Sequence, residues 1–212
     1  MKNKSLILAL IILGIVLVIL VGVYFIQKNK ALINPSGQDG STTTSQTVVE
    51  NQEGVGGDAN KIVTDDFSID LPDGWKQTAA SMGATAMAVN SNEHISDPAA
   101  QKINFQSYFA VSYETLQGKS MNDFLQIVKN GLSQTIPNVV FTKEQNMTID
   151  GRIAHAIEAE LTQQGVDFKV LVVLVAGQGE DVWVLSFNTT KSSWDGYKET
   201  FYSIANSFSV KK

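Results

Sequence analysis

Two histidines are the only ordinary candidates for a general base in this chain. His94 falls in a polar segment, where a solvated side chain is the simplest interpretation. His155 alternates in phase with Ile153, Ile157 and Leu161, which predicts a position on the packed face of a strand. Serine hydrolysis needs a nucleophile beside a base that a carboxylate orients, and no G-x-S-x-G motif accompanies either histidine. We therefore expect His155 to be structural, with a hydrogen-bond partner, and we predict no catalytic residue and no enzyme.

Gly118-Lys119-Ser120 resembles the end of a phosphate-binding loop. Tyr113 stands where the first glycine of that motif is required. A loop that ends in a serine N-cap explains the same residues, with Asp123 three positions later completing a capping box. The pattern therefore predicts the start of a helix and not a nucleotide site.

Ligands for a metal ion are sparse. The chain has no cysteine, and the two histidines lie 61 positions apart. Asp65-Asp66 and Glu180-Asp181 are adjacent acidic pairs at strand ends, and calcium would need more oxygens to converge there. Solvated turns explain both pairs, so we predict no metal site and no cofactor. The lack of cysteine also excludes disulfides and a lipidated N-terminal Cys.

The apolar run Leu6–Ile26, about 21 residues long, precedes all of these candidates and is flanked by lysines on both sides. A transmembrane α-helix needs about 20 apolar residues, so the run predicts a membrane anchor within residues 1–30. A cleaved signal peptide is the alternative, with an apolar region of about 7–15 residues and small residues at its cleavage site. Tyr24 and Phe25 stand where small residues would be required, which favours an uncleaved anchor.

The distribution of charge favours a short cytoplasmic N-terminus and an extracytoplasmic body. Lysines on the two sides of the anchor nearly balance, so they barely decide the orientation. All 21 acidic residues lie after residue 30, together with 12 of the 16 basic residues. An acidic body disfavours nucleic acid and anionic lipid as partners. We expect a single-pass protein of the cell membrane whose C-terminal domain lies outside the cytoplasm.

Composition divides the rest of the chain into two parts. Residues 31–61 are rich in Gly, Ser and Thr and cannot bury enough apolar surface to form a core, which predicts a flexible stalk. Residues 62–212 have the usual length of one domain with a single core.

Period-2 alternation dominates that domain and predicts an antiparallel meander. The expected strands are Phe67–Leu71, Ala84–Val89, Ile103–Tyr113, Val139–Ile149, Arg152–Leu161, Phe168–Ala176 and Val182–Thr189. Asp150-Gly151 and Gln164-Gly165 supply turns between consecutive strands. Because residues 168–175 are apolar at nearly every position, we expect a central strand that is covered on both faces.

Two segments follow the helical period. One is expected over residues 120–135, starting at Ser120. The other carries an aromatic-rich face formed by Trp194, Tyr197, Phe201, Ile204 and Phe208. Trp75 and Trp183 are expected in the core or against a turn, although one of the three tryptophans could line a groove. Helices against an antiparallel sheet make an α+β domain, and the doubly apolar strand favours a three-layer α/β/α sandwich.

The segment Phe67–Trp75, the helix after Ser120, and the ending from Trp183 to Phe208 together resemble the PsbP-like superfamily. This superfamily includes the PsbP proteins of the thylakoid lumen and the DcrB-type proteins of bacterial envelopes. The resemblance covers nearly all of residues 62–212. It implies an α/β/α sandwich and a non-enzymatic role in assembly or partner binding outside the cytoplasm, and it supplies no catalytic motif.

Two functions therefore stay open. The first is a membrane-anchored, extracytoplasmic module that binds a protein partner or a small ligand at the cell envelope. The second is a structural or stabilising subunit of a larger membrane complex, in which Leu6–Ile26 makes the decisive contacts. An enzyme would require a pocket where His155 meets a carboxylate and a hydroxyl.

Overall fold

The structure is a computed structural model that describes residues 60–80, 83–136 and 138–211. The predicted anchor at Leu6–Ile26, and the predicted stalk as far as residue 59, lie outside the described residues. In the part of the chain that is described, no helix combines the length and the apolar character needed to cross a membrane.

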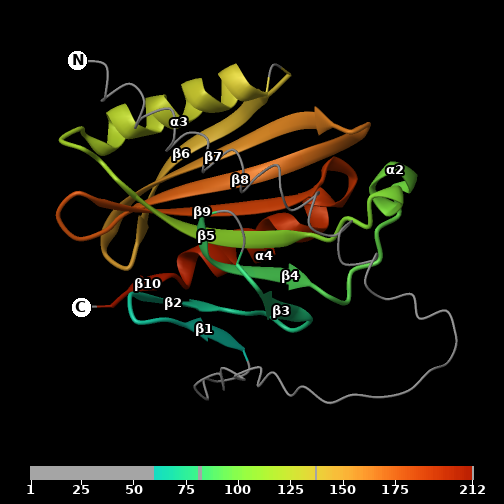
Figure 1. Ribbon diagram of the computed structural model, residues 1–212, viewed down its shortest axis with the longest axis horizontal. Coiled ribbons are helices and arrows are strands. Elements are labelled where there is room, and N and C mark those ends of the chain that lie inside the picture. Colours follow the sequence, from blue (N-terminus) through green and yellow to red (C-terminus); the bar gives the residue numbers. More distant parts are fainter. Residues whose placement is uncertain (1–59, 81–82, 137, 212) are drawn as a thin grey trace, which may run out of the picture.

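A seven-stranded antiparallel sheet forms the centre of the domain (Figure 1). Its strands, in spatial order, are β3 (Trp75–Thr78), β4 (Ala84–Asn90), β5 (Tyr108–Thr115), β9 (Asp181–Thr190), β8 (Val166–Ala176), β7 (Arg152–Gln163) and β6 (Val140–Ile149). The strands β6 to β9 pair in sequence order, which confirms the predicted meander. Asp150 and Gln164 adopt positive φ angles of 52° and 50°, each followed by a glycine that also has positive φ. These are the type of turn residues that close a two-residue hairpin.

Strand β8 lies inside the sheet and is buried on both faces, as its composition predicted. Val170, Val172 and Leu174 belong to the hydrophobic cluster on one face. Leu171 and Val173 belong to the cluster on the opposite face. Each face of the sheet therefore requires its own covering layer.

The first covering layer is α3 (Met121–Thr135) together with the short helix α2 (Pro98–Lys102). Ser120 caps α3 as predicted, because its Oγ accepts from Asp123 N at 3.1 Å while Asp123 Oδ2 accepts from Ser120 N at 3.3 Å. Phe124, Val128 and Leu132 then point to the sheet at four-residue spacing. Figure 1 shows α3 along the β6–β7 side of the molecule, with α2 at the far end of the sheet.

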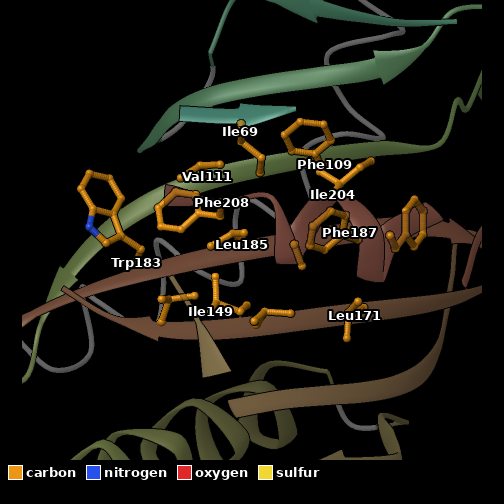
Figure 2. Close-up of a cluster of buried hydrophobic side chains, with 14 of the residues drawn as sticks. Ile69, Phe109, Val111, Ile149, Leu171, Trp183, Leu185, Phe187, Ile204 and Phe208 are labelled. Atoms are coloured by element: carbon orange, nitrogen blue, oxygen red, sulfur yellow. The ribbon is translucent and has the colours of Figure 1, made fainter. Parts of the chain in front are cut away.

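The second layer combines α4 (Trp194–Asn206), which the 3-10 turn η2 (Lys191–Ser193) precedes, with a small three-stranded sheet. That sheet has the order β1 (Lys61–Val63), β2 (Phe67–Asp70), β10 (Ser209–Val210). Ser207, at the end of α4, accepts from Asp70 N at 2.9 Å and so ties the helix to β2. Figure 2 shows the aromatic and aliphatic side chains packed between this layer and the large sheet.

Some predicted boundaries were wrong. The expected strand at Ile103–Tyr113 begins only at Tyr108, because α2 ends at Lys102 and a loop follows it. Asp97 caps α2 through Ala99 N and Ala100 N, and Pro98 at the first helical position leaves no amide unpaired there. Phe208 lies beyond the end of α4 but is buried in the same cluster. The short strand β1, which no period in the sequence indicated, begins at Lys61.

Replacing Phe201 with Ala should lower the free energy of unfolding by roughly 3–5 kcal/mol, the range for deleting a buried aromatic ring. Phe201 is fully buried, and its ring centroid lies 5.3–6.1 Å from those of Trp75, Phe187, Trp194 and Tyr197. Urea unfolding followed by tryptophan fluorescence measures the change. Glu199→Ala, on the exposed side of the same helix, is the control and should stay within about 0.5 kcal/mol of the parent. A loss below about 1 kcal/mol for Phe201→Ala would contradict the packing of α4.

Candidate functional site

A groove of about 460 Å³ lies where the small sheet meets one end of the large sheet. Residues from several distant parts of the chain line it: Asp65, Asp66, Thr85, Tyr113, Gln178, Asp181, Trp183, Val210 and Lys211. The β1–β2 turn and the C-terminal residues form one wall, and the ends of β4, β5 and β9 form the other. The groove is therefore built from two sheets that approach each other only in the folded domain.

Tyr113 is the central side chain of this groove. It is 49% exposed and is one of the few large apolar side chains at the surface of the described residues. Its hydroxyl donates to Asp181 Oδ1 at 2.6 Å, and its ring meets Trp183 edge-on at a centroid distance of 5.3 Å. The hydrogen bond to Asp181 raises the pKa of Tyr113, and burial and the charge of Asp66 add to that effect. The side chain is thus held by two contacts while about half of it stays exposed to solvent.

Trp183 forms the apolar floor of the groove. It is 5% exposed and contacts Phe67 and Phe208 at centroid distances of 5.1 and 5.8 Å. Figure 2 places its indole at one end of the buried cluster. The groove therefore continues directly into the core, and a ligand seated on Tyr113 and Trp183 would rest on rigid side chains.

The groove has an excess of negative charge. It holds the carboxylates of Asp65, Asp66 and Asp181, and Lys211 supplies positive charge. Lys211 Nζ donates to the carbonyl oxygen of Thr64, while its backbone N donates to Asp66 O at 2.8 Å. This lysine therefore closes the β1–β2 turn, and the acidic side chains face the groove with little compensation.

Comparisons with known proteins address the fold. No protein-family model matches the chain, and a search of curated proteins finds no significant match. Solved structures do match: cyanobacterial PsbP (CyanoP) from Synechocystis sp. PCC 6803 is 16% identical, with a TM-score of 0.55 over 73% of this chain and 95% of that chain. LpqN of Mycobacterium tuberculosis, described as involved in cell envelope biogenesis, is 17% identical, with a TM-score of 0.54 over 69% of this chain and 83% of that chain.

The domain has the PsbP-like fold. This confirms the resemblance that the sequence indicated at Phe67–Trp75, after Ser120 and towards Phe208. At these identities the similarity establishes the fold and carries no function with it.

The PsbP-like domain brings together acidic residues that the sequence showed only as separate pairs. Asp65 and Asp66 end the β1–β2 turn, and Asp181 begins β9, more than a hundred positions later. In the described residues, no group of three or more His, Cys, Asp or Glu could hold a metal ion. Trp183 is the tryptophan that lines the groove. The sequence signal that could have identified the site is the exposed aromatic Tyr113 on an otherwise buried strand.

His155 lies on the face predicted for it. It is 4% exposed, shares the α3 side of the sheet with Ile157 and Leu161, and its Nδ1 lies 2.8 Å from Asn146 Oδ1. The prediction that Ile153 is packed on the same face was wrong. Ile153 is 63% exposed, because it lies at the start of β7, beyond the cluster that Ile157 and Leu161 enter. His94 is exposed in a loop, as expected.

Glu158 faces the opposite side of β7 from His155, and the PsbP-like domain buries it there. Its carboxylate accepts from the Tyr202 hydroxyl at 3.0 Å and lies 3.5 Å from Lys169 Nζ and 3.8 Å from Lys143 Nζ. Lys169 Nζ also sits 4.9 Å above the Trp194 ring. This network satisfies a buried charge and fixes α4 on the sheet, which is a structural role.

Glu114, next to Tyr113 on β5, has a carboxyl group whose pKa is strongly raised. Burial raises its pKa from an ordinary value of 4.5 to about 7. Between about pH 4.5 and 7 the folded state therefore binds more protons than the unfolded state, and stability falls as the pH rises through that range.

Replacing Glu114 with Gln should abolish that part of the pH dependence. The amide imitates the protonated carboxyl, so the variant should match the parent near pH 5. Above pH 7.5 it should be more stable by an amount on the order of 1–2 kcal/mol, since partial solvation reduces the full effect of the shift. Urea unfolding at pH 5, 6, 7 and 8 tests this, with Glu180→Gln in the adjacent exposed turn as the control. A constant difference across the pH range would contradict a displaced pKa.

Proposed function

We propose that this chain is a membrane-anchored, extracytoplasmic and non-enzymatic binding protein of the cell envelope. Its PsbP-like domain binds a partner through the groove between the two sheets. The observation that carries the proposal is the half-exposed Tyr113, fixed by Asp181 and Trp183 at the centre of an acidic groove.

The chemistry of the groove favours a basic segment of a partner protein. An aromatic ring fixed beside carboxylates binds Lys or Arg by cation–π attraction and by ion pairing together. Asp65, Asp66 and Asp181 supply the charge, and the open face of Tyr113 supplies the ring. Cation–π attraction and ion pairing in one groove together give more specificity than a surface ion pair alone.

The positions of the titratable side chains relative to the groove also favour binding over catalysis. The buried His155 is on the α3 side of the large sheet, while the groove opens on the α4 side, where Trp183 is packed. The Tyr113 hydroxyl donates to the Asp181 carboxylate, and this hydrogen bond raises the pKa of the phenol away from the range useful for proton transfer near neutral pH.

The proposed location is supported by two observations. The segment Leu6–Ile26 has the length and composition of a membrane-spanning helix. LpqN, which has the same fold, is described as involved in cell envelope biogenesis.

The groove is tested by capturing partners from solubilised membranes with the tagged full-length chain. Tyr113→Ser and Asp181→Lys should each reduce recovery of any stoichiometric partner at least tenfold, because one removes the ring and the other reverses the charge. Asp73→Lys makes the same charge change at the opposite end of β2, in an exposed turn, and should leave recovery unchanged.

Two results would contradict the groove as the binding site. In the first, all three variants retain the partner equally. In the second, the partner is lost only when Leu6–Ile26 is replaced by an unrelated apolar helix, which would favour a structural subunit of a membrane complex.

Topology is tested separately with protease added to intact cells or spheroplasts. An extracytoplasmic body predicts cleavage between about residues 31 and 61 and release of a fragment that contains the PsbP-like domain. Mass spectrometry of the released fragment identifies its first residue. If residues 31–61 are cleaved only after the membrane is breached, the proposed orientation is wrong.

A further inference from the structure

The two walls of the groove are joined through a hairpin turn that lies outside the groove. Asp150 is the first residue of the β6–β7 turn, and Arg152 is the first residue of β7. Neither side chain belongs to the residues that line the groove. Each of them nevertheless contacts one wall, so the two walls meet on a single short hairpin.

Arg152 holds the wall that carries Tyr113 and Asp181. Its Nη1 donates to Gly177 O at 2.5 Å. Gly177 begins the β8–β9 turn, and its own N–H donates to Asp181 O at 2.7 Å across that turn. Asp181 in turn accepts from the Tyr113 hydroxyl. Arg152 is therefore connected to the exposed ring of the groove through one turn and one hydrogen bond.

Asp150 holds the opposite wall. Its Oδ2 accepts from Val210 N at 3.1 Å, and Val210 pairs with Phe67 of β2. Phe67 directly follows Asp66 in the β1–β2 turn. The contact at Val210 therefore also positions the acidic turn that forms part of the groove.

Arg152 is the stronger of the links between the walls. The other direct link, from Gln178 Nε2 to Lys211 O, is longer at 3.3 Å and is exposed. A hydrogen bond from a guanidinium is charge-assisted, and Arg152 Nε also lies 4.0 Å from Asp150 Oδ2. Arg152 is the only arginine in the chain, and an ammonium group in its place could not present two separate donors in a fixed geometry.

We propose that Arg152 is a positioning residue for the groove, which together with Asp150 sets the separation of the two walls. The inference rests on the proposed function, in which the groove binds a basic segment. A groove that already has the required width in the free protein binds without the cost of ordering its walls. Loss of Arg152 would release the β8–β9 turn and move Asp181 relative to Tyr113.

Charge and positioning predict opposite effects for the loss of Arg152. Removal of a positive charge near the carboxylates of the groove should, by electrostatics alone, strengthen the binding of a cation. Loss of the positioning contact should weaken it, because the aromatic ring and the carboxylates would no longer act on the same cation. The direction of the change therefore decides between the two.

The probe is a hexa-arginine peptide, titrated onto the full-length chain in nanodiscs of zwitterionic lipid. Arg152→Gln should weaken binding by about fivefold, and Arg152→Lys, which keeps the charge and one donor, should fall between Arg152→Gln and the parent. Lys129→Gln is the matched control, because Lys129 is 23% exposed against 24% for Arg152 and also pairs with a carboxylate. It lies on α3, which covers the opposite face of the large sheet, so it should bind the peptide at least as tightly as the parent.

A second measurement needs no ligand. The hydrogen bond to Asp181 raises the pKa of Tyr113, so this pKa should fall in Arg152→Gln and stay unchanged in Lys129→Gln. NMR of tyrosine labelled at Cζ follows the titration, and the Tyr113 resonance is assigned by its absence in Tyr113→Ser. If Arg152→Gln does not fold, Arg152→Lys should show both changes to a smaller extent.

Binding of the peptide by Arg152→Gln as tight as that of the parent, or tighter, would overturn the proposal. An unchanged pKa of Tyr113 in the folded variant would do the same. Failure of the proposed function gives a different result: Tyr113→Ser and Asp181→Lys would then bind the peptide as the parent does. That result would contradict the groove as the binding site, and this inference with it, whatever the Arg152 variants show.

Discussion

The structure depends on one constraint, the burial of β8 and β9 on both faces. Val170 to Val175 is apolar without a break, and β9 is buried from Val182 to Thr190. Such strands cannot lie against water on either side, so the chain must supply a layer above and a layer below the sheet. The helix α3 and the segment around α2 cover one face of the large sheet. The helix α4 and the small sheet cover the other face.

The two layers meet that constraint in different ways. The α4 side is filled mainly by interlocked aromatic rings around Phe201, Phe187 and Trp183, which favours a single rigid arrangement. The α3 side is mostly aliphatic and contains Ser186 and Asn188 with unpaired polar atoms. Each unpaired buried group lowers stability by roughly 1–3 kcal/mol.

Much of the fold could be predicted because its signals are local. The meander from β6 to β9, the capped start of α3 and the aromatic face of α4 each follow from residues close together in sequence. The strand β8 was predicted to be central because residues 168–175 are apolar at nearly every position. The short elements were harder: β1 and β10 contain three and two residues, and α2 contains five, too few for a period to show. Their positions come from pairing with β2 and from the Asp97 cap.

The candidate site could not be predicted in the same way. Tyr113, Asp181 and Asp65 are neighbours only because β5 pairs with β9 and because the small sheet docks beside them. Asp65-Asp66 and Glu180-Asp181 each had a sufficient local explanation as a solvated turn. Glu158 illustrates the same limit, since its phase on the strand gives its face of the sheet but cannot show that Lys143, Lys169 and Tyr202 enclose it.

The strand β1 has a mechanical consequence. It is the first described element after the segment that precedes residue 60, so tension along the chain from that side reaches it before any other strand. Among the described strands it pairs only with β2, and Ile62 is its one buried side chain. Strand β2 is held more firmly, by β10 and by the Ser207 hydroxyl at Asp70 N. Under load from that side, β1 would separate from β2 first, while the large sheet and the two layers that cover it stay folded.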